Sequence, residues 1–117
     1  MATYTREQLV RRVLMNLGVL GSNEAPDADD AELVDEAYQQ LMEELYEESL
    51  IPWDIAGPIP ARYFKSLTWL TAQILVLEFG KFTRVPQLEV NAQRATTKIW
   101  ALRERFYAGE LTYATYY

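Results

Sequence analysis

The chain has 117 residues, which is enough for one domain with one core, and half of its residues are hydrophobic. It has no histidine and no cysteine, which excludes disulfides, thiolate or imidazole metal sites, and Ser-His or Cys-His catalytic pairs. Its net charge is -6, and an acidic chain of this kind is not expected to bind nucleic acid non-specifically.

The N-terminal segment predicts a first helix that begins at Thr5. Residues 5–8 form a capping box, in which Thr5 and Gln8 satisfy exposed backbone donors. An apolar stripe follows at helical spacing, formed by Leu9, Val10, Val13, Leu14 and Leu17. Gly18 and Gly21 are both candidates for the C-terminal cap. No signal-peptide pattern is visible, and the most apolar run, residues 67–77, is too short to span a bilayer, so we expect no membrane association.

A second helix is predicted after the loop at residues 21–26, with Asp27 as its N-cap. Its apolar face carries Val34, Tyr38, Leu41 and Leu45. Its opposite face is almost wholly acidic, and twelve acidic residues but no Lys or Arg lie between Arg12 and Arg62. The acids at residues 27–30 lack the glycine of a calcium loop, so they indicate a helix start instead.

The second half of the chain predicts two more helices. A proline-rich connector, residues 49–60, precedes a third helix that we expect from residue 60 or 61 to Phe79, with Gly80 ending it. This helix is apolar nearly all the way round, which predicts that it is central or covered by a neighbouring subunit. A fourth, basic helix is expected from about Pro86 to Gly109. The predicted fold is therefore all-α, a small four-helix bundle over residues 1–109.

The last eight residues, 110–117, are expected to form an extended tail after Gly109. They are rich in aromatic and β-branched residues, which suit an extended segment, and carry no charge after Glu110. A terminus without docking contacts is normally small and polar. The composition therefore predicts a docking tail, whose candidate contact residues are Leu111, Tyr113, Tyr116 and Tyr117.

Two charged clusters are candidates for chemistry. Glu43, Glu44, Glu47 and Glu48 could form an acid-base pair or a Mg²⁺ site, but a charge run on an amphipathic helix is usually a solvated face. The basic residues of the fourth helix, with Trp100 and Tyr107 among them, could form a nucleic-acid stripe. We favour instead a solvated helix that pairs with acids of the second helix or of a neighbouring subunit. We expect no enzymatic activity, no metal and no cofactor.

The sequence resembles the head-to-tail adaptor proteins of tailed bacteriophages. The resemblance lies in residues 3–10 (TYTREQLV), 13–21 (VLMNLGVLG), the acidic-capped second helix from residues 25–30 (APDADD), Ile59-Pro60, and residues 78–80 (EFG). It implies a helical connector in the neck of the virion, made in the host cytoplasm. Such proteins form a ring, commonly of twelve copies, under the portal and carry the tail or nozzle protein. They surround the channel through which genomic DNA passes without specific binding, and a C-terminal extension can insert into the portal.

A ring repeats one interface between two different surfaces of the subunit. The candidates for this interface are acidic residues of the second helix and basic residues of the fourth, namely Glu43, Glu44, Glu47, Arg94, Lys98 and Arg105. The acidic surface could instead line the DNA channel, and the sequence does not choose. Two other hypotheses stay open: a small acidic cytoplasmic regulator that mimics DNA, and a carboxylate-dependent hydrolase.

Overall fold

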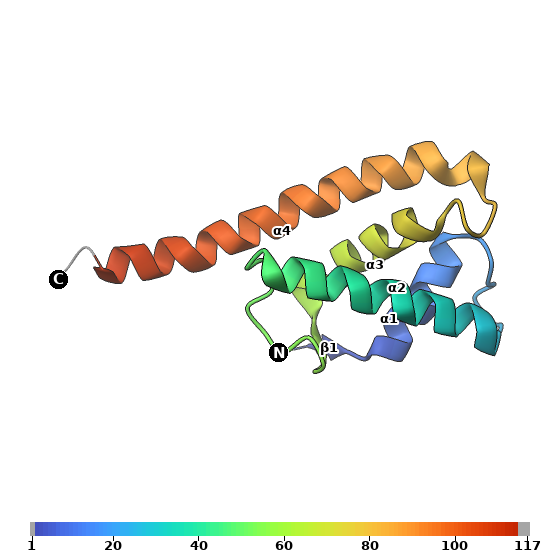
Figure 1. Ribbon diagram of the computed structural model, residues 1–117, viewed down its shortest axis with the longest axis horizontal. Coiled ribbons are helices and arrows are strands. Elements are labelled where there is room, and N and C mark those ends of the chain that lie inside the picture. Colours follow the sequence, from blue (N-terminus) through green and yellow to red (C-terminus); the bar gives the residue numbers. More distant parts are fainter. Residues whose placement is uncertain (1, 115–117) are drawn as a thin grey trace.

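The computed structural model describes the backbone of residues 2–114 and the side chains of residues 2–103. Figure 1 shows a mostly helical chain with one small antiparallel sheet. The helices are α1 (Arg6–Asn16), α2 (Ala28–Glu47), α3 (Ala61–Leu75), the 3-10 helix η1 (Phe82–Arg84) and α4 (Val85–Ala114). The sheet consists of β1 (Thr3–Tyr4) and β2 (Ile59–Pro60).

Helix α3 is the centre of the fold, because it packs against α1, α2 and α4. Thr68 and Thr71 are almost fully buried on it, and each hydroxyl donates a hydrogen bond of 2.8 Å to the carbonyl four residues earlier. These bonds let small polar side chains lie in the core without leaving a donor unpaired. Because α3 contacts the other three helices, its position is the central one of the two alternatives that the sequence left open.

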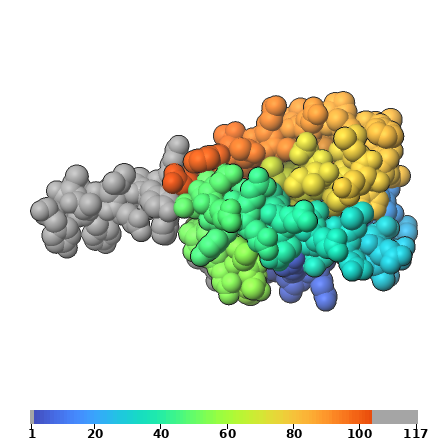
Figure 2. Space-filling model, in the orientation of Figure 1, coloured from blue at the N-terminus to red at the C-terminus, as the bar shows by residue number. Residues whose placement is uncertain are grey.

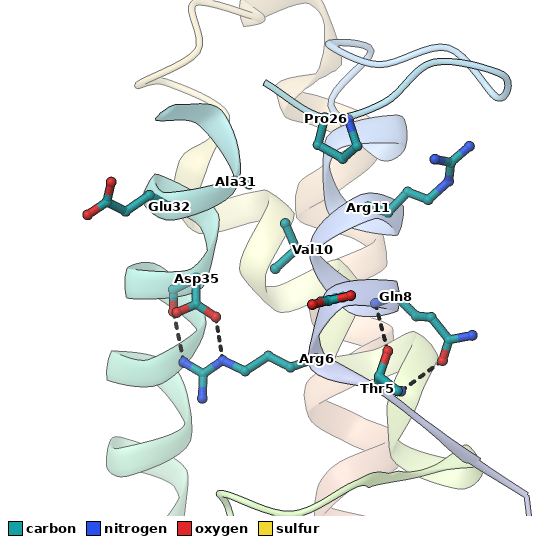
Figure 3. A pocket seen from close by; sticks show the side chains of 10 residues that line it. Thr5, Arg6, Gln8, Val10, Arg11, Pro26, Ala31, Glu32 and Asp35 are labelled. Atoms are coloured by element: carbon teal, nitrogen blue, oxygen red, sulfur yellow. Dashed lines mark hydrogen bonds and ion pairs between the residues drawn. The ribbon is translucent and has the colours of Figure 1, made fainter. Parts of the chain in front are cut away.

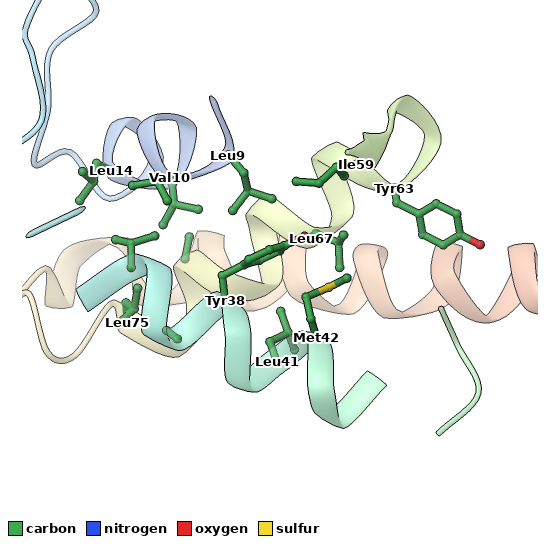
Figure 4. Close-up of a cluster of buried hydrophobic side chains, with 14 of the residues drawn as sticks. Leu9, Val10, Leu14, Tyr38, Leu41, Met42, Ile59, Tyr63, Leu67 and Leu75 are labelled. Atoms are coloured by element: carbon green, nitrogen blue, oxygen red, sulfur yellow. The ribbon is translucent and has the colours of Figure 1, made fainter. Parts of the chain in front are cut away.

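The hydrophobic core fills the space between α1, α2 and α3 (Figure 4). Leu9 and Val13 of α1, Tyr38 and Met42 of α2, and Leu67 of α3 are each at most 1 % exposed. Helix α4 adds Leu88, Ala95 and Ile99, which are also buried. The apolar stripes expected from the helical spacing thus face one another.

The mostly helical fold is confirmed, but the finer prediction of a four-helix bundle is not. Within the described part of the chain, α2 and α4 share few contacts, because α3 lies between them. Helix α4 packs mainly along α3, and Figure 1 shows its C-terminal part continuing past the other helices.

A short sheet that no pattern in the sequence predicted joins the N-terminal segment to the start of α3. Tyr4 pairs with Ile59 and Thr3 with Pro60, and the amide of Ala61 donates to the carbonyl of Ala2. The Tyr4 ring stacks on Phe64 of α3, with ring centroids 4.3 Å apart. The connector before β2 also packs on α3. The rings of Trp53 and Tyr63 meet edge to face, with their centroids 5.8 Å apart.

Several helix termini were predicted correctly. The capping box of α1 is present, with the Gln8 amide donating to Thr5 Oγ1 and the Thr5 amide donating to Gln8 Oε1. Asp27 is the N-cap of α2, although its side chain makes no capping hydrogen bond. Gly18, rather than Gly21, caps α1 at a φ of +76°, with the amide of Val19 donating to the carbonyl of Leu14.

Helix α3 ends at Leu75 rather than at the predicted Phe79. A turn over residues 76–80 follows, and Gly80 stands at its end with a φ of +69°. The amide of Lys81 donates to the carbonyl of Val76, which is the Schellman pattern that favours glycine. The same pattern closes α2, where Ser49 takes the left-handed position at a φ of +61°.

The prediction that Gly109 ends the fourth helix is wrong, because α4 continues to Ala114. An extended conformation is therefore also wrong for residues 110–114. A glycine inside a helix costs only about 1 kcal/mol relative to alanine, and Leu111 and Ala114 favour the helix. Tyr116 and Tyr117 lie outside the described residues, and the docking role of the tail stays a prediction.

Gly18 and Gly80 allow a matched test of the turns. A Cβ at Gly18 would lie 2.7 Å from the Arg84 guanidinium, which donates to the Asn16 carbonyl at 3.2 Å, whereas a Cβ at Gly80 would meet nothing within 4 Å. We expect Gly80→Ala to lower the free energy of unfolding by about 1 kcal/mol, because alanine is strained at a positive φ. Gly18→Ala should cost about 1 kcal/mol more, because it also displaces Arg84. Urea denaturation measures both, and in an Arg84→Ala background the two costs should become equal. Equal costs in the wild-type background would contradict this.

Candidate assembly interface

The acidic face of α2 is a single-sign surface. The helix carries eight acidic residues and no basic residue over Ala28–Glu47. Glu43, Glu44 and Glu47 are exposed, and Figure 2 shows α2 lying across one face of the molecule with its outer side uncovered. Glu43 accepts a hydrogen bond from Gln39 of the same helix at 3.0 Å. None of these three carboxylates forms an ion pair with any residue that the structure describes.

The basic candidates lie on the outer side of α4. Arg94 and Lys98 are exposed, and together with Val90 and Thr97 they line a shallow depression along this helix. The side chain of Arg105 lies outside the described residues. So do those of Leu111 and Tyr113, whose backbone is part of α4.

The structure does not bring these acidic and basic residues together. Since α3 separates α2 from α4, no ion pair joins the two helices among residues 2–103. Among the described residues, Arg94 and Lys98 therefore form no ion pair with the acids of α2 in the same chain. Both charged surfaces remain open to other molecules.

The described ion pair lies instead between α1 and α2 (Figure 3). Arg6 Nε is 2.5 Å from Asp35 Oδ1, and the same guanidinium donates to the Asp35 carbonyl and to Gln39 Oε1. It also lies over the Tyr38 ring, 5.0 Å from the centroid. Arg6 therefore fixes how α1 and α2 pack, a structural role that the sequence did not predict.

Tyr38 lies beside this pair and is 1 % exposed. Its hydroxyl has no hydrogen-bond partner in the described structure. Burial raises the pKa of Tyr38 to about 12; the positive charge of Arg6 opposes this shift and the negative charge of Asp35 adds to it. An unpaired buried hydroxyl reduces stability, so Tyr38 contributes through its ring.

A groove between α1 and α3 is a surface that the sequence did not predict. We call it the α1–α3 groove; its lining residues are Tyr4, Arg12, Asn16, Phe64, Lys65, Thr68 and Trp69. The lining combines three aromatic rings with two cations and contains no acidic residue. The spacing of Phe64, Lys65, Thr68 and Trp69 on one helix was visible in the sequence, but their proximity to Tyr4 and Arg12 depends on the β1–β2 pairing.

The comparisons with known proteins add no assignment. No protein-family model, no curated protein and no solved structure matches the chain. Among the described residues there is no group of three or more carboxylates placed to hold a metal ion. No helix in the described part of the chain is long and apolar enough to cross a membrane.

The Tyr38 hydroxyl gives a pH-dependent prediction. Between the unfolded pKa of 10.0 and the folded pKa of about 12, the unfolded chain loses the phenolic proton and the folded chain keeps it. The contribution of the protonated Tyr38 hydroxyl to stability is therefore fully present below pH 10 and is lost as the pH rises toward 12. We expect Tyr38→Phe to match or exceed wild-type stability at pH 7, because it removes an unpaired buried hydroxyl. The free energy of unfolding of Tyr38→Phe relative to the wild type should rise by about a further 2–3 kcal/mol by pH 12.

Chemical denaturation at several pH values measures this difference. Tyr46→Phe is the control, since that side chain is 58 % exposed. A loss of more than about 1 kcal/mol for Tyr38→Phe at pH 7 would show that the hydroxyl has a stabilising partner.

Proposed function

We propose that this chain is a virion structural protein, a head-to-tail adaptor that forms a ring on the portal of a tailed bacteriophage. The observation that carries the proposal is the exposed acidic face of α2, which no cation among the described residues neutralises, on a chain that exposes cations on other elements. The resemblance of residues 3–80 to the adaptor proteins supports it. The function is assembly through apolar, aromatic and charged contacts, with no bond chemistry.

A ring would give each subunit a partner for two different surfaces. In a closed ring each subunit contacts two neighbours through two different surfaces. The exposed acids of α2 and a basic or aromatic surface elsewhere on the chain meet this requirement. Opposite charges would mainly steer subunits and set their register, while buried apolar contacts supply most of the affinity. The resemblance implies twelve copies, a tail or nozzle protein on one side, and DNA passing through the channel.

The tail residues Leu111, Tyr113, Tyr116 and Tyr117 are the proposed contacts with the portal. Tyrosine is enriched among the interface residues that contribute most to binding. Because α4 is helical as far as Ala114, the contact would be presented at the end of a helix rather than by an extended strand.

The second candidate function is a DNA-mimicking inhibitor, which the exposed acidic face of α2 favours. It predicts a monomer or dimer that competes with DNA for a basic protein. Native mass measurement of the full chain, with and without portal, separates the two functions. A high-order species that binds portal supports the adaptor, and a persistent monomer that ignores portal contradicts it.

Removal of residues 111–117 tests the portal contact. We expect the shortened chain to keep its helical circular dichroism and its cooperative unfolding, because the described core lies within residues 9–99. Portal affinity should fall by about tenfold or more, since loss of one strong aromatic contact costs about 2 kcal/mol. Surface-immobilised portal measures the affinity.

Glu78→Gln, at an exposed turn position, serves as a control that should bind portal normally. If the shortened chain unfolds, the tail belongs to the core of the protein. If it folds and binds portal at full strength, the docking role is wrong.

A further inference from the structure

The α1–α3 groove combines exposed cations with aromatic rings on a chain whose net charge is negative. Arg12 and Lys65 are exposed at its rim, and Tyr4, Phe64 and Trp69 form its aromatic lining. The whole chain has net charge -6, yet no acidic side chain lines this groove. Aromatic residues and arginine are the types that dominate the energetics of protein interfaces.

Several side chains of the groove are held in place by contacts within the chain. Tyr4 stacks on Phe64 at 4.3 Å, and Lys65 Nζ lies 5.7 Å from the centroid of the Trp69 ring. The Thr68 hydroxyl is bound to the Phe64 carbonyl at 2.8 Å. Such a surface loses little conformational entropy when a partner binds.

We propose that the α1–α3 groove receives the acidic C-terminal end of α2 from a second copy of this chain. The segment that would enter carries Glu44, Tyr46 and Glu47. The carboxylates would face Arg12 and Lys65, and the Tyr46 ring would pack on the aromatic lining. The inference deepens the proposed function and depends on it only in requiring that copies associate.

The acidic end of α2 has the properties that this groove needs. Glu44 and Glu47 are exposed and make no ion pair among the described residues, and Tyr46 beside them is 58 % exposed. The end of α2 thus offers carboxylates and an aromatic ring to a groove that offers cations and aromatic rings. Because α2 contributes no residue to the groove, one copy can offer its groove to one neighbour and its α2 to another.

The outer side of α4 is a weaker acceptor for the same segment. Its depression contains Arg94 and Lys98, but the rest of its lining is Val90, Gln93, Thr97 and Ala101, with no aromatic ring. Exposed ion pairs without apolar burial contribute little to affinity. We therefore place the acidic end of α2 in the α1–α3 groove and not on α4.

Two complementary charge reversals test this placement. In the groove variant, Arg12→Glu and Lys65→Glu make the groove acidic; in the helix variant, Glu44→Lys and Glu47→Lys make the end of α2 basic. Each variant alone carries like charges on both surfaces, so self-association should weaken by about tenfold or more. An equimolar mixture restores opposite charges at both types of contact and should associate again. Sedimentation velocity of full-length protein over a concentration series measures this, with circular dichroism to confirm folding.

The control is Arg94→Glu with Lys98→Glu, which makes the same charge change on α4 and should associate like the wild type. The proposal is overturned if the groove variant associates normally, if only the α4 control fails to associate, or if the folded mixture stays dissociated. Loss of portal binding by the groove variant with normal self-association would assign the groove to a portal segment instead.

The proposed function can fail separately. A wild-type chain that associates as expected but never binds portal contradicts the adaptor and leaves the groove contact standing. A wild-type chain that remains a monomer at all concentrations, with and without portal, overturns both.

Discussion

The packing of three helices around α3 determines the arrangement of the other elements. Thr68, Thr71 and Ala72 are buried on this helix, and small side chains allow neighbouring helices to approach closely. With α3 in the centre, α2 and α4 share few contacts, and no ion pair joins them among the described residues. The core thus fixes where the charged surfaces lie.

Much of the helical structure was predictable because its determinants are local. The capping box at Thr5 and the proline near the start of α4 each act within a few residues of the helix end that they define, as does the glycine turn after α1, for which the sequence left Gly18 and Gly21 open. The composition of the tail was a weaker guide, because tyrosine and threonine disfavour a helix by only a few tenths of a kcal/mol each. The cost of Gly109 in a helix was therefore not large enough to end α4, which continues to Ala114.

The candidate interface was only partly visible in the sequence. The acidic residues of α2 and the basic residues of α4 follow from their helical spacing, and their exposure was expected. The α1–α3 groove was not predicted, because it joins β1, α1 and α3, and Tyr4 reaches Phe64 only when β1 pairs with β2 more than fifty residues later. A two-residue strand has no periodic pattern by which it could be recognised.

The two kinds of charged surface differ in what they can contribute to assembly. Arg6 is an example of a strongly held cation within the chain. Its guanidinium has carboxylate, carbonyl and amide partners, lies over the Tyr38 ring, and is half-buried. Arg94 and Lys98 have no comparable surroundings, so they suit steering at a distance. Arg12 and Lys65 border aromatic rings, and a partner that covers the rings also removes water from the cations. The fold therefore favours an interface in which charge selects the partner and the Tyr4, Phe64 and Trp69 rings retain it.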